Sequence, residues 1–312
     1  MDFRTVIPIS PLKIMDYEQH FLLLGSCFAE TIGRKLLEYR FTGDVNPFGV
    51  LYNPFSIADV LERLSENRPF VASELFNYDG WWHSWAHHGS FSAKTQEQAL
   101  ANINTTYLVA AERFEQTDVL ILTFGSAWVY EHDGSVVANC HKVPEREFTR
   151  RRLSVDEIVE RYTVLLSRLL KNRPYLRIVF SVSPIRYLRN GATENQTSKS
   201  ILLLATEALC RQFEAAIYFP SYEIVLDELR DYRFFADDMI HPSSMAVEYV
   251  WERFCTAFFT EKTLELLPQV AKINKALQHR PLKADSEAYR RFIEQIECEL
   301  AELKQKYPYL NI

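Results

Sequence analysis

Four short, continuous apolar runs recur along the first 220 residues, and each ends at glycine, serine or proline. A run of this kind is typical of a strand with both faces buried, as in a parallel sheet. A more polar segment before Pro47 adds a short fifth strand. Between these runs, apolar residues recur three and four positions apart, as in amphipathic helices. The predicted strands are residues 21–24, 40–46, 118–124, 177–182 and 216–219. The predicted helices are residues 30–39, 55–64, 95–114, 154–170, 194–215 and 243–259.

This alternation of strands and helices predicts an α/β fold, in which one parallel sheet is covered by helices on both faces. Two segments depart from this alternation of strands and helices. Residues 67–95 are rich in tryptophan, histidine and phenylalanine, and they predict an inserted loop or hairpin. Residues 139–152 carry mixed charges and predict a loop.

The C-terminal residues have a different pattern. We expect an α/β domain over residues 1–260 and a helical extension over residues 261–312. The extension has an apolar stripe along one side of a predicted helix. Such a stripe packs on the parent domain or on a second copy of the chain, so a homodimer through the C-terminal helix is one expected assembly. The stripe comprises Phe292, Ile296, Leu300 and Leu303.

Composition narrows the range of partners. The formal net charge of -6 argues against a nucleic-acid partner, which would call for a basic face. Five scattered cysteines, an odd number, favour free thiols in a reducing compartment, so we expect a cytoplasmic protein. No apolar stretch approaches the length of about 20 residues that spans a membrane, so no membrane partner is expected.

The stretch 21–29 places two candidate nucleophiles at a strand-to-helix turn. Gly25 permits the tight turn after the strand, and Ser26 is expected to cap the following helix. Cys27 then lies in the first helical turn, where the helix dipole and free backbone N–H groups favour the thiolate. In an open α/β sheet, ligands bind at this carboxyl edge.

Asp238 and His241 form a second candidate pair. A histidine acts as a base when a carboxylate holds its other ring nitrogen protonated. Their three-residue spacing, in a loop that leads into a helix, allows the two side chains to converge. Asp237 is an alternative orienting carboxylate.

The stretch Gly25-Ser-Cys-Phe-Ala29 resembles the signature of the GSCFA proteins, which look like relatives of the SGNH (GDSL-type) hydrolases. The resemblance spans about residues 20 to 260. It implies a three-layer, flavodoxin-like sheet of the SGNH-hydrolase kind. The resemblance continues through the segments 46–54, 82–88, 124–130, 139–142, 183–186, 194–199 and 237–242.

The resemblance implies an ester hydrolase or acyltransferase that works through a covalent acyl-enzyme. The related enzymes carry Gly-Asp-Ser, so Cys27 falls in the position of the nucleophile and Ser26 in that of the aspartate. Ser26 as the nucleophile, shifted by one residue, is the alternative. His241 is then the general base and Asp238 its orienting carboxylate.

Such a reaction also needs donors for an oxyanion. The backbone N–H of Cys27 and the loop that contains Gly49 are the first candidates. In the related enzymes an asparagine after the third strand contributes, but here the segment reads Gly125-Ser126-Ala127. Ser126 must then serve, or an asparagine from a neighbouring loop, Asn46 or Asn53, replaces it.

Further candidates for substrate binding come from loops and helix starts. The histidines of the aromatic insertion suit the wall of a pocket for a small-molecule or carbohydrate ester, and an arginine after a strand suits a carboxylate or phosphate. Lys199 is interpreted as surface charge. The expected binding residues are Gly49, Asn53, Gly125, Ser126, His83, His87, Arg186, Glu194 and Asn195.

Two other functions remain open. The missing asparagine favours a non-catalytic binding module on the same fold. His83, His87, His88, Cys140 and His141 include zinc-ligand types, so a metal-dependent hydrolase is a second alternative. The leading hypothesis requires neither a metal nor a cofactor.

Overall fold

Five parallel strands form the central sheet of the protein. A computed structural model describes residues 5–277 and 287–310; residues 1–4, 278–286 and 311–312 lie outside this description. Counted along the chain, the strands follow the spatial order 2-1-3-4-5, which is the flavodoxin-like order. The fold class predicted from the sequence is confirmed. In spatial order the strands are β10 Ala216–Phe219, β9 Arg177–Val182, β5 Thr117–Phe124, β1 His20–Gly25 and β2 Thr42–Val45.

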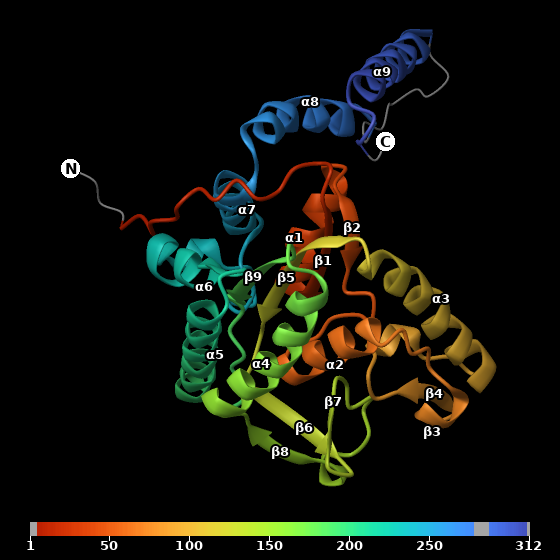
Figure 1. The fold of residues 1–312 in the computed structure, drawn as a ribbon, viewed down its shortest axis with the longest axis vertical. Coiled ribbons are helices and arrows are strands. Elements are labelled where there is room, and N and C mark those ends of the chain that lie inside the picture. The colour runs from red at the N-terminus through yellow and green to blue at the C-terminus, as the bar shows by residue number, and fades with distance from the viewer. Residues whose placement is uncertain (1–4, 278–286, 311–312) are drawn as a thin grey trace.

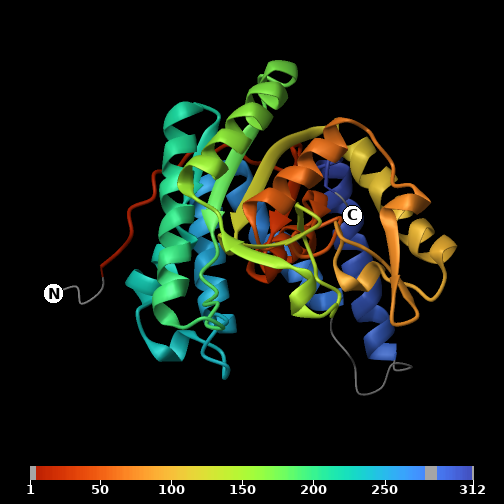
Figure 2. The ribbon, with the colours of Figure 1, turned by 90° about the horizontal axis from the view of Figure 1, so that it is seen from below.

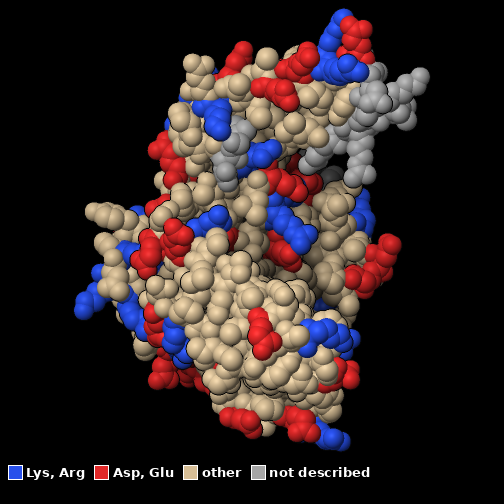
Figure 3. All heavy atoms as spheres, turned by 90° about the vertical axis from the view of Figure 1, so that its right-hand side faces the viewer, with Lys and Arg blue, Asp and Glu red and all other residues tan. Residues whose placement is uncertain are grey.

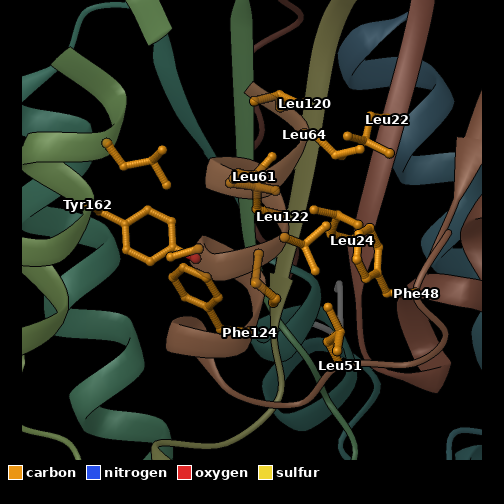
Figure 4. Packing of buried hydrophobic residues seen from close by; sticks show 14 of the residues in the cluster. Leu22, Leu24, Phe48, Leu51, Leu61, Leu64, Leu120, Leu122, Phe124 and Tyr162 are labelled. Carbon is orange, nitrogen blue, oxygen red and sulfur yellow. The ribbon is translucent and has the colours of Figure 1, made fainter. Parts of the chain in front are cut away.

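The strands supply alternate residues to two hydrophobic cores, one on each face of the sheet. In β1, Leu22 and Leu24 enter the first core, whereas Phe21 and Leu23 enter the second. Figure 4 shows how leucines of β1 and β5 meet Leu61 and Tyr162 in the first core. Because both faces are buried, the strands read as continuous apolar runs in the sequence.

Helices cover both faces and make the molecule three-layered (Figures 1 and 2). Helices α2, α3, α4 and α5 contribute side chains to the first core, and α1, α7, α8 and α9 contribute to the second. The short helix α6, Ser221–Glu223, continues into a π-helical turn, Ile224–Leu229. The other bounds are α1 Cys27–Glu38, α2 Pro54–Ser65, α3 Gln96–Phe114, α4 Val155–Asn172, α5 Ala192–Gln212, α7 Ser244–Phe258, α8 Glu261–Leu277 and α9 Glu287–Lys306.

Asn53 caps helix α2. Its side-chain oxygen accepts the N–H of Ser56 at 2.8 Å, and its amide group donates to the Ser56 hydroxyl at 2.9 Å. Both residues are buried, so these bonds replace contacts with water that folding removes.

We expect Asn53→Ala to lower the free energy of unfolding by about 1–2 kcal/mol, because the first turn of α2 loses its acceptor. Urea denaturation measures the change. Asn53→Ser is the matched control, since serine also caps helices, and it is expected to lose less than alanine does. Equal losses in the two variants would contradict a capping role.

The aromatic insertion is a two-stranded antiparallel hairpin, which settles the predicted choice between loop and hairpin. Strand β3 covers Leu75–Tyr78 and β4 covers Trp81–Ser84. The two residues between them, Asp79 and Gly80, both have positive φ, as a tight Asp-Gly hairpin turn requires.

A three-stranded antiparallel sheet lies at the end of the molecule opposite α8 and α9 (Figure 1). The loop predicted for residues 139–152 is wrong in its last part, because β8 pairs with β6 there. The sequence Thr-Arg-Arg-Arg lacks apolar alternation, and ion pairs to its arginines hold it instead, such as Arg151 with Glu131 at 2.8 Å. The strands are β6 Trp128–His132, β7 Ser135–Val137 and β8 Thr149–Arg152.

The C-terminal segment is helical, as predicted, and its apolar stripe packs within the chain. Ile296 and Leu303 of α9 are buried in the second core, and Phe292 and Leu300 pack against that core. A homodimer through this helix stays a prediction, and it would have to use another side of α9.

Figure 3 shows acidic and basic side chains interspersed on one face, with a broad, mostly uncharged area in its lower half. No helix within residues 5–277 and 287–310 is long and apolar enough to cross a membrane. The expectation of no nucleic-acid partner stays a prediction.

Candidate functional site

The carboxyl ends of β1, β5 and β9 meet at one edge of the sheet. Gly25 lies beside Thr123, which lies beside Ser181. Gly25 has φ +153°, and a Cβ there would come within 2.4 Å of the Thr123 carbonyl oxygen. Glycine is therefore required where β1 turns into α1, and the next two residues are placed at this edge.

Cys27 begins α1, and its side chain is partly exposed. Its Sγ lies 3.6 Å from His241 Nε2, although 214 positions separate the two residues. The structure thus brings together the cysteine and the histidine that the sequence singled out.

Ser26 occupies the N-cap position of α1, but its side chain makes no capping bond, so the expected hydroxyl cap is wrong. The hydroxyl instead donates to Ser183 Oγ at 3.0 Å and links the ends of β1 and β9. Ser26 is 2% exposed. This burial and this hydrogen bond make it a much poorer nucleophile than Cys27.

Asp238 orients His241. Its Oδ2 lies 2.6 Å from His241 Nδ1, and its Oδ1 accepts the backbone N–H groups of Ile240 and His241 at 2.9 Å each. These hydrogen bonds lower the pKa of Asp238 to about 2, and the two from the backbone have the largest effect. The carboxylate stays ionised at neutral pH, and Asp238, not Asp237, makes the contact.

The turn that carries these two residues is fixed by backbone bonds. Met239 adopts a left-handed conformation with φ +56°. The N–H of Ala236 donates to the carbonyl of His241 at 2.7 Å, and the N–H of Arg186 donates to the carbonyl of Ile240 at 3.2 Å. The loop after β9 therefore holds the backbone of the turn that carries His241.

Burial raises the pKa of the Cys27 thiol, which corrects the expectation of a stabilised thiolate. Hydrogen bonds from the N–H groups of Cys27 and Phe28 lower it, but the charges of Glu30 and Asp238 raise it again. The resting side chain is consequently a thiol. It needs a base before it can attack, and His241 Nε2 is the group in contact with it.

Lys199 is not the surface charge that the sequence predicts. It is 1% exposed, and its ammonium group donates to the carbonyl oxygens of Gly125 and Ser183 at 2.6 Å each. Burial lowers its pKa to about 7, and the charge of Cys27 acts in the opposite direction. Lys199 therefore joins the ends of β5 and β9 beneath the site.

The expected oxyanion donors are mostly occupied. The N–H of Gly49 donates to the Asn46 carbonyl at 2.7 Å, and the N–H groups of Gly125 and Ser126 both donate to the Tyr52 carbonyl. Ser126 Oγ accepts the N–H of Trp128 at 3.1 Å. These residues shape the loops of the site, and their N–H groups are not available to a substrate.

Three other donors remain: two backbone N–H groups at Cys27 and the amide of Asn46, which bonds to the neighbouring Gly25. The N–H groups of Cys27 and Phe28 point toward the sulfur at the open first turn of α1. Asn46 accepts the N–H of Gly25 at 2.8 Å through Oδ1, and its buried Nδ2 has no hydrogen-bond partner among the described residues. Asn53, in contrast, is committed to Ser56.

Gly49 has a structural reason for being glycine. Its φ is +84°, and a Cβ there would lie 2.2 Å from the Cβ of His88. The loop after β2 and the aromatic insertion therefore touch at this residue. The N–H of Gly49 is hydrogen-bonded within the chain, so it does not support the expected role of Gly49 in substrate binding.

Among the described residues, the histidines of the insertion make no hydrogen bond to Cys27, and of the three only His87 is buried in the core, whereas His83 is half-buried and His88 exposed. His87 is 1% exposed and stacks on Phe48 at 4.6 Å between ring centroids, and burial lowers its pKa to about 3. His83 bonds to Ser92 Oγ at 2.6 Å. His141, which follows β7, donates to the Ser84 carbonyl at 2.8 Å, so both His83 and His141 are held by hydrogen bonds to residues of the insertion.

The metal-dependent alternative receives no geometric support. Within the part of the chain that the structure describes, no three His, Cys, Asp or Glu side chains are grouped so that they could hold a metal ion. Burial also raises the pKa of Cys140 to about 11, which disfavours the thiolate that a metal would bind.

The three remaining binding candidates lie around the start of α5. Glu194 pairs with Arg152 at 2.7 Å. Asn195 is 7% exposed and accepts the N–H of Tyr187 at 2.8 Å. Arg186 is partly buried in the loop that supports the His241 turn.

Fold and site together define a parallel α/β protein with a cysteine, a histidine and an aspartate in line at the carboxyl edge of its sheet. The chain belongs to the GSCFA family, which its residues 20–254 match. Residues 270–312 match the C-terminal domain of GSCFA domain proteins. No curated protein matches the sequence.

Two solved structures resemble the chain weakly. A carbohydrate esterase family 3 protein from Talaromyces cellulolyticus has 9% identity and a TM-score of 0.37, over 80% of this chain and 98% of that chain. An acetyl esterase mutant solved with an acetate ion has 10% identity and a TM-score of 0.35, over 81% of this chain and 99% of that chain. Scores this low say nothing about the site.

Proposed function

We propose that the protein is an ester hydrolase or acyltransferase that forms a covalent acyl-enzyme on Cys27. The observation that carries this proposal is the continuous line from Asp238 through His241 to the Cys27 thiol. A nucleophile in contact with a base, and a base held by a third group, is the arrangement that nucleophilic acyl transfer needs.

The reaction begins when His241 Nε2 takes the thiol proton and Sγ of Cys27 attacks the acyl carbon. Asp238 keeps the proton on Nδ1 and stabilises the imidazolium that forms. The carbonyl oxygen becomes an oxyanion, for which the N–H groups of Cys27 and Phe28 and the amide of Asn46 are the available donors.

Collapse of this intermediate breaks the ester C–O bond. The leaving oxygen takes the proton from His241, the alcohol departs, and a thioester remains on Cys27. Water or an acceptor hydroxyl then gives its proton to His241 and attacks the thioester. Attack by water releases an acid, and attack by an acceptor hydroxyl releases a new ester; in both cases the thiol is restored.

A non-catalytic binding module is the second candidate function. It is favoured by the occupied N–H groups of Gly49, Gly125 and Ser126, which leave fewer oxyanion donors than the sequence predicted. Under this hypothesis the protein binds a ligand at the carboxyl edge of the sheet without catalysing a reaction.

The two functions differ in their reaction with p-nitrophenyl acetate. We expect the purified protein to release a burst of p-nitrophenol and to gain the mass of one acetyl group, as seen by intact mass spectrometry. Prior alkylation with iodoacetamide should prevent both. No burst and no adduct, at a protein concentration equal to that of the ester, would favour the binding module.

A further inference from the structure

A pocket of about 320 Å³ lies against the turn that carries His241. The loop after β9, the start of α5 and the segment 222–235 form its walls. Two contacts join it to the turn: the N–H of Arg186 donates to the Ile240 carbonyl, and Phe235 pairs with Pro242 as an isolated bridge. Two residues of the pocket wall, Arg186 and Phe235, therefore pair through the backbone with the residues on either side of His241.

Two arginines of the pocket wall lack acidic partners. Within the described residues, neither Arg186 nor Arg230 has an ion pair or a side-chain hydrogen bond; the guanidinium of Arg186 lies 5.9 Å from the Phe235 ring centroid. The acidic residue of the wall, Asp231, is near Arg233 at 3.7 Å. The pocket thus offers two positive charges to a ligand.

The start of α5 adds donors to the same pocket. Ala192 lines it, and Gly191 at the N-cap has no side chain to bond the N–H groups of the first turn. Asn195 and Gln196 also line it, and each uses its side-chain oxygen within the chain, on Tyr187 N–H and Tyr222 O–H, which leaves the amide N–H groups for a ligand. A helix start with donors beside it favours an anion.

We propose that this pocket binds a carboxylate or phosphate group on the ester that Cys27 attacks. The inference rests on the proposed function and names its substrate class, an ester that carries an anionic group. The rings of Tyr222, Tyr232 and Phe235 line the same pocket and provide apolar area for the chain that joins this group to the ester.

The kinetic test compares p-nitrophenyl acetate with the p-nitrophenyl half ester of succinic acid. The wild type should prefer the anionic ester, and Arg186→Gln should lower the ratio of the two kcat/KM values by about tenfold or more, as expected for the loss of a charged hydrogen bond. Arg189→Gln is the matched control, since Arg189 is on the same loop but pairs with Glu145 outside the pocket. A ratio that Arg186→Gln leaves unchanged overturns the proposal.

A binding test separates this proposal from the proposed reaction. Inorganic phosphate and succinate are added separately to the Cys27→Ala protein, and thermal unfolding is followed. Stabilisation by either anion that Arg186→Gln and Arg230→Gln both reduce supports the pocket, even if no ester is turned over, and the more effective anion identifies the group. Stabilisation by neither anion, or equal stabilisation in the variants, overturns it.

Discussion

Replacing Cys27 with alanine is expected to abolish acylation by p-nitrophenyl acetate and to lower its turnover by about 10⁴-fold or more, to the background rate. The reason is that the thiol supplies the bond that the acyl group forms, and no other nucleophile contacts His241 Nε2 among the described residues. Intact mass spectrometry follows the adduct, and p-nitrophenol release gives the rate.

Ser26→Ala is the matched control for this prediction. It removes a hydroxyl one residue away and breaks the bond to Ser183, at a cost of about 1 kcal/mol in the free energy of unfolding. The adduct should still form. An adduct that survives in Cys27→Ala and disappears in Ser26→Ala would move the nucleophile by one residue and refute the assignment.

His241→Ala separates the role of the base from that of the thiol. Because burial raises the pKa of Cys27, the variant should acylate slowly near neutral pH and recover as the pH rises and the thiolate forms without help. The wild type should depend less on pH in this range. Parallel pH profiles in the two proteins would show that His241 does not act as the base.

The sequence predicts most of the sheet because burial on both faces leaves a strong signal. Residues 21–24 and 118–124 have no polar alternation, and each supplies both cores. Strand β8 leaves no such signal, because ion pairs of arginines with residues far along the chain hold it. Such partners can be identified only once the fold is known.

The sequence predicts the central residues of the candidate site through their motifs, but it does not predict the contacts of the residues around them. Cys27 follows the glycine that the turn after β1 requires, and Asp238 and His241 are three residues apart in one turn, so both motifs are visible in the sequence. The hydroxyl of Ser26 bonds to Ser183 across the sheet, and spacing along the chain does not reveal such a partner. His87 looked available in an aromatic loop, yet it is packed in the core.

The sequence does carry a signal for the burial of Lys199. Lys199 falls four residues after Asn195, three before Leu202 and seven before Thr206, all of which are buried. A lysine in register with a buried helical face is unusual, because a charged group in that position needs hydrogen bonds or loses its proton. Here two carbonyl oxygens provide the hydrogen bonds, and no carboxylate faces the ammonium among the residues described.

Lys199→Met is expected to change how stability depends on pH. Burial lowers the pKa of Lys199 from 10.5 to about 7, so between these values the unfolded chain binds more protons than the folded chain. The free energy of unfolding therefore rises with pH across that window, by at most about 1.4 kcal/mol per pH unit. Below about pH 7, burying the charged lysine lowers the free energy of unfolding by its full amount. From about pH 6 to about pH 9, the wild type should gain about 2 kcal/mol or more relative to Lys199→Met.

Urea denaturation of both proteins at several pH values measures this difference. Lys171→Met, which removes an exposed lysine at the end of α4, reports the effect of losing surface charge alone. At about pH 6, where the ammonium is charged, Lys199→Met should also slow the alkylation of Cys27, because the thiolate loses a nearby positive charge. If the stability curves of the wild type and Lys199→Met run parallel, and the alkylation rates agree, Lys199 merely fills space between β5 and β9 and does not tune the cysteine.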